Sequence, residues 1–256
     1  MTDKINEFFK KYYKTLLFFA IVGLVGGFFV GLYSLDSYPE EIKNEVYAQG
    51  LNDLLIGVVT AVQSAGYGIV LGAVGILLGI QTGLFKGETK LERRPLMYTL
   101  AVALVGGAAM ILFDLLIFGR YSEVIMDSYK VKPTIDYLIA TVLYGGVIEE
   151  VMLRLFMLSL VVFVLWKLFG KGAEKPSAII LVPANLIAAL LFAAGHMPAT
   201  AILMGITPIT LIRCFLLNGG LGFLFGWLYY KHGLRYSMLA HAGCHVVSKL
   251  IWILFI

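Results

Sequence analysis

The stretch that decides the fold is TVLYGGVIEEVMLRLFMLSLVVFVLW, residues 141–166. It is longer than the ~20 helical residues that cross the hydrocarbon layer of a bilayer. Its apolar residues run continuously and do not alternate, which favours a transmembrane helix over a barrel strand. Three ionisable residues, Glu149, Glu150 and Arg154, lie near its middle. A charge at that depth is expensive, so each of the three needs a structural or chemical explanation.

The rest of the chain has the same apolar character. Of its 256 residues, 60% are hydrophobic and 14% are charged, whereas a soluble domain has about 25% charged residues. We therefore expect an all-α, polytopic transmembrane helix bundle that forms one membrane-embedded domain over residues 1–256. The predicted spans are 15–35, 54–85, 95–118, 134–168, 183–204, 208–230 and 234–256. Several glycines in the second span allow a break there, so eight spans are the alternative to seven.

Lysine and arginine predict the orientation. They concentrate before the first span and in alternate loops, which places the N-terminus in the cytoplasm of a multi-pass cell-membrane protein. The residues on this side are Lys4, Lys10, Lys11, Lys14, Lys86, Lys90, Arg93, Arg94, Lys167, Lys171, Lys175, Lys231 and Arg235. No basic patch with interleaved aromatic residues lies outside the spans. We therefore expect membrane lipids, and no nucleic acid, as partners.

The adjacent carboxylates have different surroundings on a predicted helix. Glu150 and Arg154 are four residues apart on one helix face, so they can neutralise each other. Glu149 points about 100° away from Glu150 and has no local countercharge. A buried carboxyl of this kind is suited to proton transfer. The alternative is an ion pair that only locks two helices together.

Three of the four histidines also lie in predicted spans. His196 comes just before Pro198, which can break the helix near it and admit water. His241 and His245 are four residues apart, so they stack on one helix face about 6 Å apart along the axis. The residues between them are small and let another helix approach closely. A single buried histidine is often only a core residue, but this combination with two carboxylates favours a functional site.

The other buried polar groups have simpler interpretations. Asp114, near a span end and Arg120, is expected to be structural or interfacial. Arg213 and Lys249 lie close enough to span ends to extend toward the headgroups. Cys214 and Cys244 both lie in apolar runs and are interpreted as small core residues, because no disulfide framework or CxxC site is present.

Three motifs now resemble those of a known family. Glu149-Glu150-x-x-x-Arg154 reads as EExxxR, and Phe192-x-x-x-His196 reads as FxxxH. His241-x-x-x-His245 stands where His-x-x-x-Asn/Asp is expected. Their order and their placement in separate spans resemble the CPBP family of CAAX proteases and bacteriocin-processing (Abi) membrane proteins, over residues 95–250. The resemblance implies an intramembrane endopeptidase that cleaves near the C-terminus of a membrane-associated or prenylated, CAAX-like peptide or protein.

The resemblance also implies roles for individual residues. Glu149 resembles the catalytic glutamate that activates water, and His196 resembles its partner. His241 resembles the histidine that stabilises the oxyanion. His245 departs from the expected Asn or Asp, although a neutral imidazole can also donate one hydrogen bond. The resemblance makes Glu150, Arg154 and Phe192 the structural support of the site.

Two alternatives remain at this stage. The favoured scheme uses no metal and no cofactor, but the pair His241 and His245 is also a competent chelate. With His196 and Glu149, it could hold Zn²⁺ in a metalloprotease. The second alternative is a non-enzymatic protein, such as a transporter, a bacteriocin immunity factor or a scaffold, with a buried Glu/His ion site. In either case these residues meet near mid-bilayer only if the helices tilt, and we expect a cavity that opens toward the cytoplasm.

Overall fold

The computed structural model describes residues 2–87, 90–170 and 172–256, and these residues contain seven helical segments long and apolar enough to cross a membrane. Each predicted span overlaps one segment. The segments are Ile5–Ser37, Asp53–Thr82, Arg93–Arg120, Ile135–Phe169, Ala178–Met204, Pro208–His232 and Leu234–Phe255. The second segment is one unbroken helix despite its glycines, so the count is seven and not eight. Lys171, one of the predicted cytoplasmic cations, lies outside the described residues.

Several spans are divided into shorter elements. The first two are α1 (Thr2–Ser37) and α3 (Asp53–Thr82), with the short α2 (Glu40–Ala48) between them. The third is α4 (Arg93–Leu116), followed by η1 (Phe118–Arg120) and α5 (Glu123–Ser128). The fourth consists of α6 (Ile135–Ile139), η2 (Ala140–Glu149), η3 (Val151–Leu158) and α7 (Ser159–Phe169). The last three consist of α8 (Ala178–Gly195) and α9 (Met197–Met204), then α10 (Pro208–Cys214), η4 (Phe215–Gly219) and α11 (Gly220–His232), then α12 (Leu234–Phe255).

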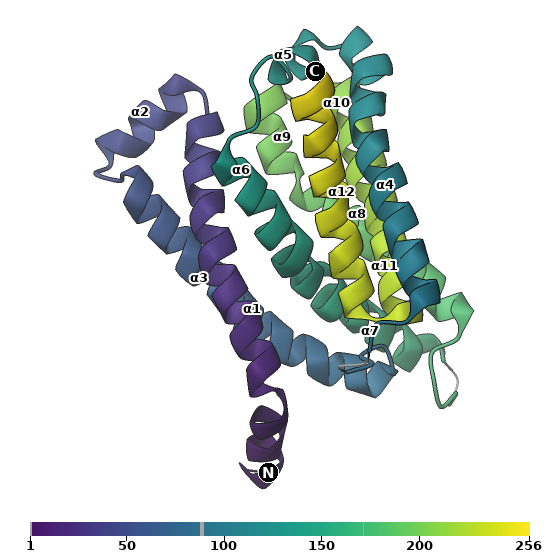
Figure 1. The fold of residues 1–256 in the computed structure, drawn as a ribbon. Coiled ribbons are helices and arrows are strands. Elements are labelled where there is room, and N and C mark those ends of the chain that lie inside the picture. Colours follow the sequence, from purple (N-terminus) through teal and green to yellow (C-terminus); the bar gives the residue numbers. More distant parts are fainter. Residues whose placement is uncertain (1, 88–89, 171) are drawn as a thin grey trace.

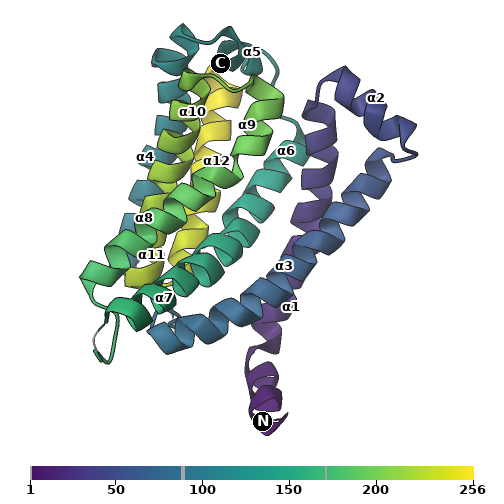
Figure 2. The same ribbon diagram turned by 180° about the vertical axis from the view of Figure 1, so that it is seen from behind.

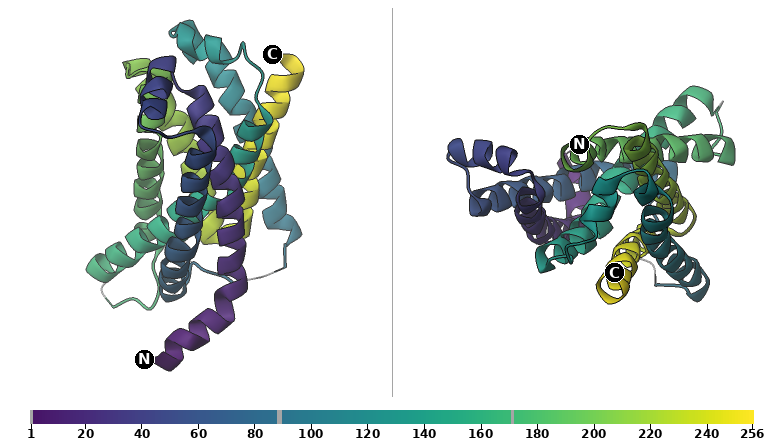
Figure 3. Two further views of the ribbon diagram at one scale, coloured as in Figure 1. Left: turned by 90° about the vertical axis from the view of Figure 1, so that its left-hand side faces the viewer. Right: turned by 90° about the horizontal axis from the view of Figure 1, so that it is seen from above.

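The helices form two groups with the fourth span between them. Helix α1 packs along α3, while α4, α8, α11 and α12 form a compact bundle (Figures 1 and 2). The segment η2 contacts both α1 and α12, so it joins the two groups. The chain ends lie at opposite ends of the molecule, as an odd number of spans requires (Figure 3).

Small residues set the spacing of the helices. Gly23 and Gly27 of α1 lie so close to Ser64 of α3 that a Cβ on either glycine would approach it within 2.7 Å. Gly107 of α4 lies equally close to the backbone carbonyl of Cys244 in α12. Such contacts let backbones approach in a bilayer, where the hydrophobic effect does not drive helices together. Cys244 is thus buried at a helix interface, as expected for a small core residue.

The fourth span differs from the α-helix that its sequence predicts. Its central part, from Ala140 to Leu158, is wound as π-helix except at Glu150. A π-helix bonds each residue to the fifth along the chain, so each turn holds more residues than an α-helical turn. The expected angle of about 100° between Glu149 and Glu150 is therefore wrong, because each residue turns through a smaller angle. The π-helix is rare and occurs mostly as single-turn bulges, which are frequently found at functional sites.

Candidate active site

Glu150 is the centre of a buried polar cluster. Its side chain is fully buried, and its Oε1 atom lies 3.0 Å from Nη1 of Arg154, as the four-residue spacing predicts. His241 Nδ1 is 2.8 Å from the same oxygen, and the Ser237 hydroxyl donates to the other oxygen. A buried carboxylate is tolerated only when it is paired and hydrogen-bonded. Both oxygens of Glu150 are therefore occupied by structural contacts.

The guanidinium of Arg154 connects three helices. It donates to the backbone carbonyl of Gly222 in α11 at 3.1 Å. It also lies over the rings of Phe192 in α8, 4.5 Å from the centroid, and Phe225 in α11, at 5.4 Å. These contacts hold the fourth span against α8 and α11. They are compatible with the structural role that the sequence motif implies.

Glu149 lies on the other side of His241. Its Oε2 atom is 3.9 Å from Nε2 of His241, and about one fifth of its side chain is exposed (19%). The two glutamates therefore face the two nitrogens of one imidazole ring. Glu149 keeps free carboxylate capacity, whereas Glu150 has none.

The rings of His241 and His245 stack, with centroids 5.0 Å apart, and Phe225 covers the far face of His241 at 4.5 Å. Their Nε2 atoms converge on Gly145 of η2. A Cβ placed on Gly145 would lie 3.0 Å from Nε2 of His245 and 3.8 Å from Nε2 of His241. The neighbouring Gly146 lies as close to Ala242. Two glycines thus let η2 approach the histidine face of α12.

His196 lies where α8 ends and α9 begins, a break that fits the prediction from Pro198. Its Nδ1 atom is 3.0 Å from the carbonyl oxygen of Phe192, one turn earlier. The Phe192 ring contacts both His196, at 4.7 Å between centroids, and His241, at 5.8 Å. Phe192 therefore positions both imidazoles.

The three histidines of the spans line one small cavity of about 30 Å³, together with Asn218. This volume is sufficient for one or two water molecules. Residues from three separate spans thus meet at one place, as the sequence analysis expects for tilted helices. The direction in which the cavity opens stays a prediction.

Sequence reasoning did not single out two residues near this cluster, Ser237 and Asn218, and it gave a third, Lys249, no place in the site. Ser237 donates to Glu150, Asn218 lines the cavity, and Lys249 contacts His245. A polar residue one helical turn from a motif residue was the available signal for Ser237 and Lys249. Asn218, an amide within an apolar run, was visible as an exception to its surroundings.

Two expectations about isolated charges are wrong. Arg213 does not extend to the headgroups: its Nε and Nη2 atoms each donate to a different oxygen of Asp114 at 2.6 Å. Asp114 thus pairs with Arg213 and not with the nearby Arg120. Lys249 does not extend outward either; it is 4% exposed and lies between His245 and the ring of Tyr137. The partner of Arg213 comes from a distant span. Lys249 has one partner on its own helix, His245, and one from the fourth span, Tyr137.

Tyr129 completes the Asp114 cluster. Its hydroxyl donates to Oδ2 of Asp114 at 2.8 Å. Burial and the neighbouring carboxylate raise the pKa of this hydroxyl, so that it keeps its proton and remains a donor. Asp114 therefore has three donors.

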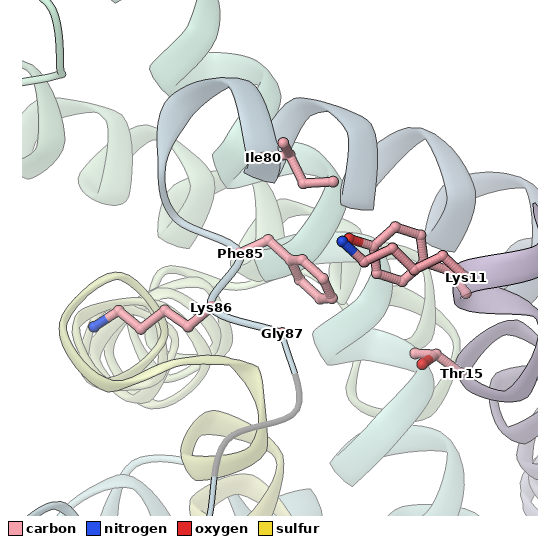
Figure 4. Close-up of a pocket in the computed structure, with 7 residues that line it drawn as sticks. Lys11, Thr15, Ile80, Phe85, Lys86 and Gly87 are labelled. Atoms are coloured by element: carbon pink, nitrogen blue, oxygen red, sulfur yellow. The ribbon is translucent and has the colours of Figure 1, made fainter. Parts of the chain in front are cut away.

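A larger groove lies beside the active-site helices. It has a volume of about 670 Å³ and is mostly apolar, and three basic residues, Lys14, Lys86 and Arg235, line it. A neighbouring pocket of about 540 Å³ shares Thr15, Phe85, Lys86 and Gly87 with it; Figure 4 shows Phe85 between Lys11 and Lys86. The groove is bounded by α1, η2 and α12. It therefore lies along the two helices that carry Glu149 and His241.

The donor set gives limited support to a metal site. Among residues 2–87, 90–170 and 172–256, no group of three His, Cys, Asp or Glu side chains is arranged to hold a metal ion. The ring of His245 already has the amine of Lys249 at its Nδ1 atom, 3.3 Å away. A divalent cation on the same ring would lie close to this basic group, which opposes its binding.

Fold and site together define a class: a multi-pass helical membrane protein with a buried carboxylate–histidine centre. Residues 132–247 match the family model described as type II CAAX prenyl endopeptidase, Rce1-like. The matched region contains all three motifs, and the match confirms the family resemblance that these motifs indicated. The family indicates a protease. No curated protein and no solved structure matches the chain.

Proposed function

We propose that the protein is an intramembrane endopeptidase that hydrolyses a peptide bond near the C-terminus of a prenylated, CAAX-like substrate. The observation that carries the proposal is the position of Glu149. Its carboxylate lies 3.9 Å from Nε2 of His241 and is partly exposed, whereas Glu150 is used in structural contacts with Arg154, His241 and Ser237. The family's description as prenyl endopeptidases supports the substrate class.

In the proposed mechanism, Glu149 accepts a proton from a water molecule that His196 orients. The water oxygen attacks the peptide carbonyl, and Glu149 later returns the proton to the leaving amine. Nδ1 of His241 lies 2.8 Å from Glu150, and this contact orients the ring so that its Nε2 atom faces the side of Glu149. We assign this Nε2 to the developing oxyanion. His245 supplies the second N–H near Gly145.

The groove between α1, η2 and α12 is the candidate site for the apolar part of the substrate. It is lined by Val142, Val147 and Ala242, which belong to the active-site helices, and its volume suits a long hydrocarbon chain. Lys14 and Arg235 would face an acidic group of the peptide. They also support a cytoplasmic N-terminus, since the basic residues gather at the end of the bundle where α1 begins.

The test is cleavage of a quenched-fluorescent farnesylated CAAX peptide by the purified protein in detergent. Wild type and Glu149→Gln are compared, each with and without a strong chelator. We expect cleavage that is lost in the variant and retained under chelator. Loss under chelator as well would replace this mechanism by the Zn²⁺ scheme. Near-normal cleavage by Glu149→Gln would exclude a glutamate-activated water, and flux without cleavage would favour a transporter.

A further inference from the structure

Lys249 has no role in the mechanism above, although it is buried beside the site. It is one turn after His245 on α12, and its Nζ atom is 3.3 Å from Nδ1 of that ring. Its ammonium group also lies over the ring of Tyr137, 4.3 Å from the centroid. With 4% of its surface exposed, it cannot be solvated by bulk water. Such an expensive side chain calls for an explanation at the site itself.

The state of the His245 ring determines whether it can serve the reaction. A neutral imidazole carries one N–H, on Nδ1 or on Nε2, and only the nitrogen with the proton is a donor. The Nε2 atom points to Gly145, where Nε2 of His241 also converges. The Nδ1 atom points away from that place, toward Lys249. His245 can therefore donate into the site only when its proton is on Nε2.

We infer that Lys249 is a positioning residue that fixes His245 as the Nε2–H tautomer. An N–H of Lys249 donates to Nδ1, so Nδ1 must be the acceptor and the proton resides on Nε2. The pair then presents one N–H into the site, as a side-chain amide would. Lys249 acts through His245 and does not contact the substrate. The inference deepens the proposed function and rests on it for its kinetic consequence.

The first measurement does not depend on activity. Histidine labelled with ¹⁵N is incorporated into the purified protein, and the tautomer of His245 is read from its ring nitrogen shifts in detergent. The chain has four histidines, and His245→Asn assigns the resonance. We expect the Nε2–H form in wild type and a redistribution toward Nδ1–H in Lys249→Met. A wild-type ring protonated on Nδ1 alone, or an unchanged ring in the variant, would overturn the inference even if peptide cleavage is established.

The second measurement is a kinetic cycle of wild type, Lys249→Met, His245→Asn and the double variant. An asparagine amide donates without any choice of tautomer, so it does not need Lys249. We expect Lys249→Met to lower kcat by about 10- to 100-fold with little change in KM in wild type. In the His245→Asn background the same change should cost less than about threefold. Equal losses in both backgrounds would make Lys249 a merely structural residue.

A matched control removes a different lysine that contacts α12. Lys132 is exposed and donates to the carbonyl of Trp252 near the end of that helix. Lys132→Met should leave both the His245 ring shifts and the kinetic cycle unchanged. If wild type cleaves no peptide, the proposed function fails, while the ring measurement still decides the inference.

Discussion

Two carboxylate–guanidinium pairs with a buried carboxylate, Asp114–Arg213 and Glu150–Arg154, lie among the described residues, and the second of them accompanies a cavity with histidines. Asp114 receives two hydrogen bonds from Arg213 and one from Tyr129, so its cluster is closed. Glu150 is occupied in a similar way by Arg154, His241 and Ser237. The difference is the next residue, Glu149, which stands beside the second cluster with unused oxygen capacity. A satisfied ion pair supports structure, and the group left over beside it is available for chemistry.

Replacing a carboxylate by the matching amide should have different effects at Glu149 and at Asp114. At Glu149 it should lower turnover, at Asp114 it should lower stability, and the effect on turnover is the larger. Glu149→Gln should lower kcat by on the order of 10²–10⁴-fold, because it removes the group that transfers the proton. His196→Ala should also lower kcat strongly, because it removes the group that orients the water. The melting temperature in detergent should stay near that of wild type. Peptide cleavage and a thermal melt measure the two quantities. A variant that melts much earlier than wild type would show that Glu149 is structural.

Asp114→Asn should instead affect stability. The amide leaves the partly buried Arg213 without a full charge partner, which costs up to about 3 kcal/mol. We expect a clearly lower melting temperature, with kcat of the folded protein unchanged. A thermal melt in detergent measures the first quantity. The kcat is measured at a temperature at which wild type and Asp114→Asn are both folded. A loss of turnover in a fully folded Asp114→Asn would remove the contrast between the clusters.

A smaller effect should come from filling the place where the histidines converge. Gly145→Ala puts a methyl group 3.0 Å from Nε2 of His245, so the ring must move by a few tenths of an ångström. We expect kcat to fall by about 10-fold or more, because small displacements at a reacting centre are costly. Gly220→Ala is the control, since a Cβ there meets no atom within 4 Å. Equal activity of both variants would show that this place is not occupied during the reaction.

The smallest effect is expected from metal removal. Exhaustive chelation should change the cleavage rate by less than about twofold, because the metal-free scheme needs no Lewis acid. It should not change the melting temperature. A rate that falls to background and returns when Zn²⁺ is added would assign Glu149 and the histidines as ligands.

The sequence was sufficient for the spans because membrane insertion depends on local hydropathy. The pair Glu150 and Arg154 was also predictable from local sequence, because the two residues are four apart on one helix. The expectation that Arg213 and Lys249 extend to the headgroups was wrong, because distance to a span end does not reveal inward partners such as Asp114 for Arg213 and His245 and Tyr137 for Lys249. The π-helical winding was also outside sequence reasoning, because it depends on how η2 packs against α1 and α12. Whether the assigned roles of Glu149, His196, His241 and His245 are correct remains for the experiments above.

The placement of the two ion pairs along the chain has a consequence for biosynthesis. Glu150 and Arg154 are one turn apart on the same helix, so that segment can enter the bilayer with this pair already neutralised. Asp114 and Arg213 are 99 residues apart on separate spans, and each must be inserted before it meets the other. The third span, which carries Asp114, therefore has no countercharge for this residue until the sixth span, with Arg213, is inserted. Truncation of a nascent chain before residue 208 should leave this span the most readily expelled from the translocon.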